Sequence, residues 1–262
     1  MTAHVARKRF GQHFLVDATC VRRIVEAVAP QPDECVVEIG PGLGALTTPL
    51  LTRVDRLHVV EIDRDIVAKL RARWPPERLV VHEADALKFD FAALGNRLRL
   101  VGNLPYNIST PLLFRVAGLG DRIADAHFML QKEVVDRMVA MPGSTEYGRL
   151  TVMLQYRFAM HKLFEVGPEA FRPPPKVDSA VVLMRPLNPL PQSATDPVLF
   201  AQVVTRAFTQ RRKTLRNALA GMLEPRQMAL LGIDPGARPE TLPVAAWVAA
   251  ANWLSRRDSS FE

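Results

Sequence analysis

Residues 35–45 read Cys-Val-Val-Glu-Ile-Gly-Pro-Gly-Leu-Gly-Ala. Four of the first five residues are apolar, a composition typical of a buried strand, and the next five contain three glycines. A helix is predicted to follow over residues 45–51. A strand that passes through a glycine-rich turn into a helix is the repeating unit of a parallel α/β sheet.

The same alternation of strands and helices surrounds this unit. Because short apolar strands alternate with helices, the sequence predicts a parallel sheet that is covered on both faces. Strands are predicted at 57–61, 79–82, 98–101 and 125–130, with two closing strands at 157–166 and 180–185. Helices are predicted at 16–29, 66–73, 108–117, 134–141 and 150–156.

A linker composition marks a domain boundary near residue 188. Residues 186–197 read Pro-Leu-Asn-Pro-Leu-Pro-Gln-Ser-Ala-Thr-Asp-Pro, and the pattern beyond them is helical only. We therefore expect an α/β domain over residues 1–188 and a small, all-helical domain over residues 189–262.

The charge balance favours a polyanionic partner. Lys and Arg number 34 against 27 Asp and Glu, which gives a formal charge of +7. Such a surplus points most often to nucleic acid. No apolar run approaches the roughly 18 residues that span a membrane, and no secretory signal is evident. Two cysteines, Cys20 and Cys35, imply neither a disulfide framework nor a metal site, so the cytoplasm is the expected location.

The glycine loop and the acids that follow the next two strands suggest a nucleoside site. Glycines let the backbone approach a ligand closely, and Gly40 begins the loop. Glu61 ends the second strand, 21 residues after Gly40, where a carboxylate can accept both ribose hydroxyls. Asp85 follows the third strand and can accept from an adenine amino group. Because the loop also fits the dinucleotide fingerprint, a nicotinamide dehydrogenase is an alternative. A P-loop is excluded, since no Gly-Lys-Ser/Thr follows.

The fourth strand ends in Asn103-Leu104-Pro105-Tyr106, which we predict to be the catalytic motif. Ligands of open α/β sheets bind outside the carboxyl ends of the strands, so the motif lies beside the nucleoside site. An exocyclic amine such as N6 of adenine is a poor nucleophile, because its lone pair is delocalised into the ring. The Asn103 side-chain oxygen and the Leu104 carbonyl could hold both N–H bonds and free that lone pair. Pro105 stiffens the turn, and Tyr106 offers a stacking face worth about 1–3 kcal/mol to the target base.

This motif is similar to the Asn/Asp-Pro-Pro-Tyr motif of adenine-N6 methyltransferases. Along nearly its whole length the chain resembles the bacterial ribosomal small-subunit adenine dimethyltransferases, the KsgA/RsmA family. The resemblance is carried by residues 7–15, 37–44, 101–111, 129–134, 173–182 and 210–214.

The resemblance implies a Rossmann-like methyltransferase fold and S-adenosylmethionine as methyl donor. The sequence contains no cluster of metal-ligating residues, so no metal is expected. The resemblance also implies the transfer of four methyl groups to two adjacent adenosines in the hairpin near the 3′ end of 16S rRNA, late in 30S assembly. The target base must be turned out of its stack. By the family pattern, His13 and Leu15 close over the donor, Gly40 lies against its methionine part, Glu61 holds the ribose, Asp85 holds the adenine, and Asn103 touches donor and target. The family commonly has Asn where this chain has His13.

Two basic clusters are candidates for contact with rRNA phosphates. One is the N-terminal group Arg7, Lys8 and Arg9. The other lies on a single amphipathic helix predicted over residues 203–219, which places Arg206, Arg212, Lys213 and Arg216 on one face and Arg211, without an explanation, on the apolar face. Lys176 in the proline-rich stretch is a further candidate. Phe171 is expected either to stack on the flipped base or to pack in the core.

These observations predict a cytoplasmic, S-adenosylmethionine-dependent rRNA adenine dimethyltransferase that acts as a monomer on an immature 30S subunit. The nearest alternative enzyme is the related large-subunit adenine methyltransferase that confers antibiotic resistance. A non-catalytic assembly factor is the alternative from another class, against which the intact motif at residues 103–106 argues.

Overall fold

The computed structural model describes residues 12–258, so the cluster Arg7, Lys8 and Arg9 lies outside the described residues. The chain divides into two compact units. The first, the α/β unit, contains residues up to Val135 and residues 159–186. The second, the helical unit, contains residues 136–158 and the chain from Leu187 onward. Residues 136–158 were expected in the first domain, whereas their contacts join them to the second unit.

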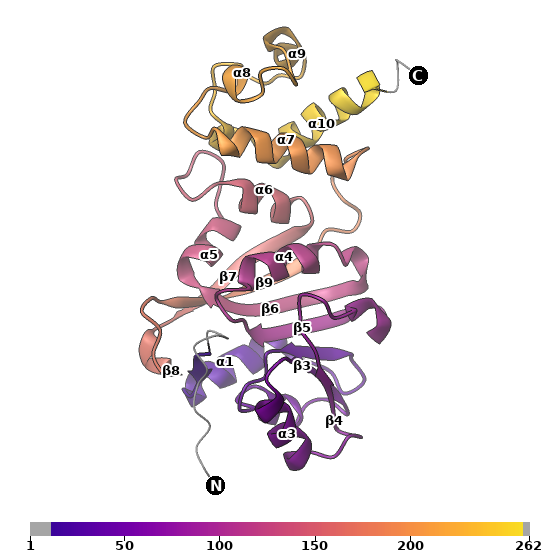
Figure 1. Cartoon of the computed structure of the whole chain (residues 1–262), viewed down its shortest axis with the longest axis vertical. Coiled ribbons are helices and arrows are strands. Elements are labelled where there is room, and N and C mark those ends of the chain that lie inside the picture. The colour runs from indigo at the N-terminus through magenta and orange to yellow at the C-terminus, as the bar shows by residue number, and fades with distance from the viewer. Residues whose placement is uncertain (1–11, 259–262) are drawn as a thin grey trace. The chain divides into compact units, whose positions relative to one another are not determined.

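Within the described residues, seven strands of the α/β unit form one sheet in the order β4-β3-β2-β5-β6-β9-β7 (Figure 1). The strands are β2 (Val36–Ile39), β3 (Leu57–Glu61), β4 (Leu79–Glu83), β5 (Leu98–Asn103), β6 (Ile123–Gln131), β7 (Phe158–Val166) and β9 (Ser179–Pro186). From β4 to β6 all neighbours are parallel, and β9 pairs antiparallel with β6. The predicted strands and the Rossmann-like fold class are confirmed.

The helices of the α/β unit lie between consecutive strands. They are α1 (Ala18–Val28), α2 (Thr47–Leu50), α3 (Arg64–Arg73), α4 (Ser109–Ala117) and the first half of α5 (Lys132–Met138). Asp17 caps α1 through a bond from the Cys20 amide, and Asp63 caps α3 through a bond from the Asp65 amide. The helix predicted over 45–51 is shorter in the structure, where α2 contains four residues.

A second, two-stranded sheet was not predicted. β1 (Phe14–Leu15) pairs antiparallel with β8 (Phe171–Arg172), so that Phe14 faces Arg172 and Leu15 faces Phe171. This pair ties a segment near the start of the chain to the segment that precedes β9. Residues 12–15 are called the N-terminal strap below.

A buried charge network holds the amino ends of β5 and β6. The Arg99 guanidinium donates to both carboxylate oxygens of Asp125, at 3.1 and 2.7 Å, and to Glu34 Oε2 at 2.6 Å. It also donates to the Val28 carbonyl, at 2.6 Å, where α1 ends. Burial alone would raise the pKa of Asp125, but hydrogen bonds from His127 and Arg99 and their charges hold that pKa below its usual value.

The helical unit has its own core around the fully buried Tyr147, Phe200 and Trp247. Its elements are α6 (Arg149–Gln155), α7 (Pro197–Thr209), α8 (Leu215–Ala218), α9 (Pro225–Leu230) and α10 (Val244–Asp258). The Tyr147 hydroxyl donates to the Leu242 carbonyl at 2.8 Å, which fixes the loop before α6 to the segment before α10.

The single helix predicted over residues 203–219 is wrong. α7 ends at Thr209, a turn follows, and α8 begins at Leu215. The amides of Leu215 and Arg216 donate to the carbonyls of Ala237 and Pro235 instead of to the preceding turn of a helix. Tertiary hydrogen bonds therefore replace the helical ones at this point.

Arg211, which had no explanation on the apolar face of the predicted helix, has partners once that helix is broken. Its guanidinium donates to the Thr145 carbonyl and lies 3.9 Å from a carboxylate oxygen of Glu240. The residue thus joins the turn after α7 to two other segments of the helical unit.

Candidate active site

A cavity of about 290 Å³ lies at the carboxyl ends of the parallel strands. Its walls come from the N-terminal strap, the glycine loop after β2, the end of β3, the loop after β4 and the motif after β5. Every residue predicted to bind the donor or to form the catalytic motif lines it: His13, Leu15, Gly40, Glu61, Asp85, Asn103, Leu104, Pro105 and Tyr106. The α/β topology brings these five segments together at one edge of the sheet.

The glycine loop has backbone conformations that other residues rarely adopt. Gly40 has φ +69° and Gly42 has φ +53°. A Cβ on Gly42 would lie 3.0 Å from Cδ1 of Phe14, and a Cβ on Gly40 would face the Asn103 carbonyl oxygen and Cδ of Pro105, each at 3.8 Å. A side chain at Gly42 would crowd Phe14, and the positive φ angles of Gly40 and Gly42 disfavour other residues at both positions.

Glu61 ends β3 and is only 7% exposed. Its Oε1 accepts hydrogen bonds from the amides of Ile62 and Asp63, both at 2.9 Å. Burial raises the pKa of this carboxyl, while the backbone donors of Asp63, Ile62 and Gly42 act in the opposite direction. The side chain is thus held rigidly at the cavity wall.

Glu38, within β2, is a polar cavity residue that was not predicted. It is 1% exposed, and the Thr47 hydroxyl donates to its Oε2 at 2.6 Å. Burial, together with the nearby charge of Glu61, raises the pKa of Glu38 to about 8, so this carboxyl is largely protonated at neutral pH. An acidic residue inside an otherwise apolar strand was the signal that could have identified it.

Asp85 follows β4 and is held by the chain just beyond it. Its Oδ1 accepts a bond from the Leu87 amide at 2.9 Å, and its carbonyl accepts bonds from the amides of Lys88 and Phe89. This turn places the carboxylate on the cavity wall formed by the loop after β4.

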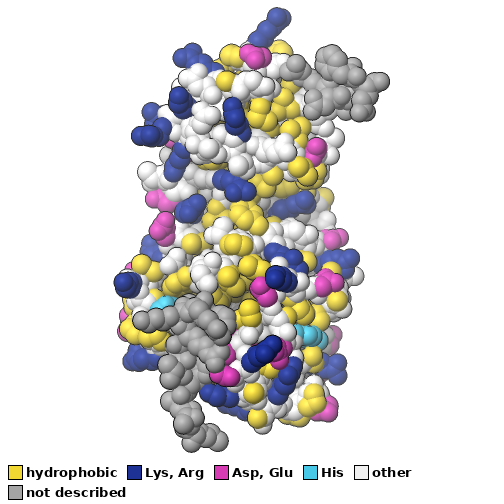
Figure 2. Space-filling model, in the orientation of Figure 1, with side chains coloured by type: hydrophobic (Ala, Val, Ile, Leu, Met, Phe, Trp, Pro, Cys, Tyr) yellow, Lys and Arg dark blue, Asp and Glu magenta, His cyan; other side chains and the backbone are white. Residues whose placement is uncertain are grey.

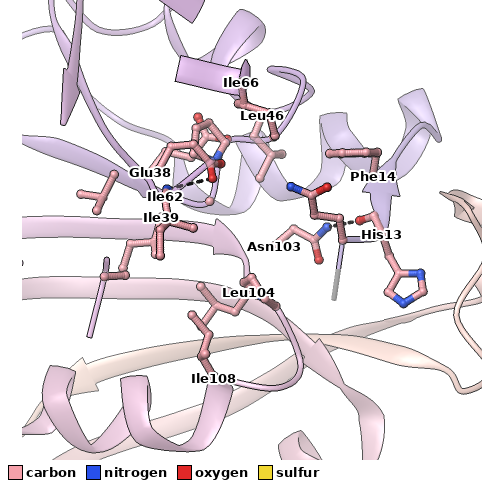
Figure 3. A pocket seen from close by; sticks show the side chains of 18 of the residues that line it. His13, Phe14, Glu38, Ile39, Leu46, Ile62, Ile66, Asn103, Leu104 and Ile108 are labelled. Atoms are coloured by element: carbon pink, nitrogen blue, oxygen red, sulfur yellow. Dashed lines mark hydrogen bonds between the residues drawn. The ribbon is translucent and has the colours of Figure 1, made fainter. Parts of the chain in front are cut away.

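Asn103 has a fixed amide orientation. Its Nδ2 donates to the main-chain carbonyl of His13 at 2.8 Å (Figure 3). Because a carbonyl can only accept, the strap binds the NH₂ side of the amide and leaves Oδ1 as an acceptor for a ligand. Gly102 allows the chain to reach this point, since a Cβ there would lie 2.4 Å from the Ile39 carbonyl oxygen of β2.

The rest of the motif is anchored as firmly. Leu104 is 1% exposed, and its amide donates to the Met129 carbonyl of β6 at 3.0 Å. The Tyr106 hydroxyl shares a hydrogen bond of 2.7 Å with the hydroxyl of Ser179. Burial raises the pKa of Tyr106, so the phenol stays neutral in the physiological range.

The strap is held against the cavity from three sides. Gln12 donates to Oδ2 of the buried Asp63 at 3.1 Å, beside Glu61. Phe14 lies over Gly42, and the His13 ring bonds to the Pro173 carbonyl at 2.8 Å. Neither the bond from Asn103 to the strap nor the bond from Gln12 to Asp63 was predicted, because both join segments far apart in sequence.

Phe171 is too deeply buried to stack on a flipped base, which was one of the two roles expected for it. Its side chain is fully buried in the core of the α/β unit, and β8 pairs with β1 at this residue. The alternative, that the ring packs in the core, is the one that the structure supports. The candidates Lys176, Arg206, Arg212, Lys213 and Arg216 are all exposed.

A family model described as "Ribosomal RNA adenine dimethylase" matches residues 3–256. The chain belongs to the ribosomal RNA adenine dimethylase family. Curated relatives of this adenine dimethylase include the "Ribosomal RNA small subunit methyltransferase A" of Laribacter hongkongensis, which is 62% identical over 254 residues and covers 96% of this chain and 97% of the relative. The protein of the same name from Chromobacterium violaceum is 59% identical, with 97% of each chain covered.

Solved structures give the same family relationship. A dimethyladenosine transferase from Plasmodium falciparum superimposes on this adenine dimethylase with a TM-score of 0.80 at 25% identity, covering 94% of this chain and 98% of the other. The 23S rRNA methyltransferase ErmE superimposes with a TM-score of 0.72 at 26% identity, covering 92% and 99%. The predicted enzyme class, an rRNA adenine dimethyltransferase, is confirmed, and the nicotinamide dehydrogenase alternative is wrong.

The helices and the ionisable clusters of the described residues were also compared with the needs of a membrane span and of a metal site. None of the helices among residues 12–258 is long and apolar enough to cross a bilayer. In the same range, no cluster of three or more His, Cys, Asp or Glu side chains has a geometry that could hold a metal ion.

Proposed function

We propose that this adenine dimethylase transfers methyl groups from S-adenosylmethionine to N6 of two adjacent adenosines in the 3′-terminal hairpin of 16S rRNA. The substrate would be an immature 30S subunit in the cytoplasm, and the enzyme would act as a monomer without a metal. The observation that carries the proposal is the acceptor orientation of Asn103 in a cavity that also contains Glu61 and Asp85.

The cavity residues fit the proposed donor. Glu61 offers a rigid carboxylate for the two ribose hydroxyls, and Asp85 an acceptor for the adenine amino group. Between the glycine loop and the motif, the missing side chain of Gly40 leaves room for the methionine part. When bound, the donor supplies an electrophilic methyl group on a positively charged sulfonium sulfur. The sulfur leaves as a neutral thioether, so the leaving group needs no acid catalyst.

Glu61→Ala should weaken the binding of S-adenosylmethionine about 10- to 100-fold, because hydrogen bonds to a charged group contribute roughly 1.5–3 kcal/mol. Isothermal titration calorimetry would measure this change. Glu83 is the matched control, since it is the register partner of Glu61 on β4 but is partly exposed and paired with Arg64. Glu83→Ala should leave the affinity unchanged. An equal loss in both variants would show that Glu61 has no specific role in donor binding.

The Asn103-Leu104-Pro105-Tyr106 motif would activate the target amine. Oδ1 of Asn103 and the Leu104 carbonyl oxygen would accept hydrogen bonds from the two N6–H groups. The nitrogen lone pair would then point at the donor methyl. The nitrogen would attack the methyl carbon, the bond from that carbon to sulfur would break with its electron pair left on sulfur, and the surplus N6 proton would pass to solvent water. Alignment of reactants in this way can supply about 7–11 kcal/mol of a barrier.

Labelled S-adenosylmethionine and small subunits from a strain that lacks this modification would test the proposal. Digestion and mass spectrometry of the product should find dimethyladenosine at two adjacent positions near the 3′ end. The likeness to ErmE makes large-subunit rRNA the second substrate to try. Transfer to that RNA alone would refute the proposed target, and RNA binding without transfer would favour an assembly factor.

The helical unit and the proline-rich stretch offer exposed cations for rRNA phosphates. On the face in Figure 2, dark blue Lys and Arg side chains recur over the helical unit. Arg206 lies on α7, Arg212 and Lys213 lie in the turn after it, and Arg216 lies on α8, all exposed. We propose that these residues, with Lys176 and the N-terminal cluster, bind the RNA backbone.

RNA affinity should therefore fall steeply with salt. If about four phosphates are neutralised, the slope of log K against log salt is about −3, so affinity drops roughly 50- to 100-fold between 50 and 200 mM salt. Filter binding would measure the slope. Arg212→Gln with Lys213→Gln should reduce it by about 1.5–2. Arg53→Gln with Arg64→Gln removes the same charge from exposed sites in the α/β unit and should not change it. Identical slopes for the two pairs would exclude the turn after α7 from the RNA site.

A further inference from the structure

The side chain of His13 extends away from the end of the cavity that contains Glu38 and Ile62 (Figure 3). Its Nδ1 lies 2.8 Å from the Pro173 carbonyl, and since a carbonyl can only accept, Nδ1 carries the proton and donates. The imidazole is therefore anchored to the chain between β8 and β9, on the side of the strap away from Glu38.

The same imidazole stacks on Tyr106. The two ring centroids are 5.6 Å apart, and the ring planes differ by 27°. At its other end the phenol is held by Ser179, through a hydrogen bond of 2.7 Å. Tyr106 is thus fixed at its hydroxyl and on one face, so a target base can stack only on the opposite face.

The main chain of His13 holds the other functional residue of the motif, since its carbonyl accepts the bond from Asn103 Nδ2. One residue of the strap therefore contacts both Asn103, which would orient the target amine, and Tyr106, which would stack on the target base. The His13 carbonyl accepts the hydrogen bond from Asn103, and the His13 ring stacks on Tyr106.

We propose that the His13 side chain is a positioning residue for the target adenosine, acting through Tyr106, and that it contributes little to donor binding. This inference rests on the proposed function. It differs from the role that the family resemblance implies for this position, which is contact with the donor. Stacked aromatic pairs and the hydrogen bond to Pro173 supply the physical basis, because both limit the rotation of the rings.

Three variants separate the two roles. His13→Phe keeps a stacking ring without the Nδ1 donor, His13→Asn keeps a polar group without the ring, and His13→Ala lacks both. Calorimetry should give affinities for S-adenosylmethionine within about twofold of wild type for all three, which would also show that the cavity is folded. For the RNA substrate, kcat/KM should fall about fivefold to tenfold in His13→Ala and less in His13→Phe, as expected for loss of an aromatic pair.

A double-mutant cycle with Tyr106→Ala tests whether His13 acts through Tyr106. If it does, adding His13→Ala to Tyr106→Ala should reduce kcat/KM for RNA no further. If the two residues act independently, the fold-reductions of the two single variants would multiply in the double variant. A loss of donor affinity with unchanged RNA kinetics, or a fully multiplicative cycle, would overturn the proposal. If the wild-type enzyme modifies only large-subunit RNA, the proposed function fails, and the same cycle on that RNA still decides the role of His13.

Discussion

Asn103→Ala should reduce methyl transfer about 10²- to 10³-fold, the usual cost of losing one preorganised polar group that acts on the reacting atoms. The substitution removes the acceptor proposed for the N6–H bond. It also removes the amide that binds the His13 carbonyl, so the strap loses one contact. Single-turnover kinetics with labelled donor would measure the rate, and filter binding should find the RNA affinity unchanged.

Asn103→Asp and Asn96→Ala sharpen this test. Asp keeps an acceptor but places a carboxylate against the His13 carbonyl, so its rate should lie between those of wild type and the Ala variant. Asn96 lies on the surface, where it accepts a bond from Arg122, and its substitution should have no effect on the rate. A near-normal rate for Asn103→Ala would refute the activation mechanism.

Arg99→Met should cost about 3–5 kcal/mol of the free energy of unfolding, because it leaves the carboxylate of Asp125 buried without its main partner. Asp125 is 9% exposed and receives two hydrogen bonds from Arg99. The substitution also removes the donor at the Val28 carbonyl, where α1 ends. Urea denaturation followed by circular dichroism would measure the change.

The pH dependence of this loss can be predicted. In the wild type the pKa of Asp125 lies below its unfolded value, so the stability that the ionised group contributes is present above that unfolded value and is lost as pH falls through the folded pKa. Without Arg99, the Asp125 carboxyl loses hydrogen bonds and a positive charge that help to lower its pKa. The difference between wild type and Arg99→Met should therefore shrink from about pH 7 to about pH 3.

A double variant checks the cause of the Arg99 effect. Arg99→Met combined with Asp125→Leu removes both charges and should recover most of the lost stability, as apolar replacement of a buried ion pair often does. Failure to recover would mean that the contacts of Arg99 with Val28 and Glu34 dominate instead.

Local sequence signals were sufficient for the parallel sheet and for four residues of the cavity, but not for Glu38. Strand periodicity and the glycine loop are local signals, and the rule that ligands bind at the carboxyl ends of strands collects Gly40, Glu61, Asp85 and Asn103 at one edge. The structure brings all four to the same cavity. Their individual roles remain proposals.

The features that were missed depend on distant contacts. β1 and β8 are two residues each, too short for a periodic signal, and their pairing buries Phe171. The bonds from residues 215–216 to residues 235–237 end the helix that local periodicity predicts. Likewise, the alignment of the Asn103 amide depends on a main-chain carbonyl, which no side-chain pattern can reveal.

The pairing of β1 with β8 has a consequence for biosynthesis. His13 and its partner Pro173 are separated by 160 residues, so the strap leaves the ribosome long before the segment that holds it in place. At about 5–20 residues per second, the interval is roughly 8–30 s. During this time the strap lacks its partner Pro173, and the Tyr106 hydroxyl lacks its partner Ser179. A nascent chain that ends before Ser179 therefore lacks two of the contacts that hold the strap and Tyr106 in the complete active site.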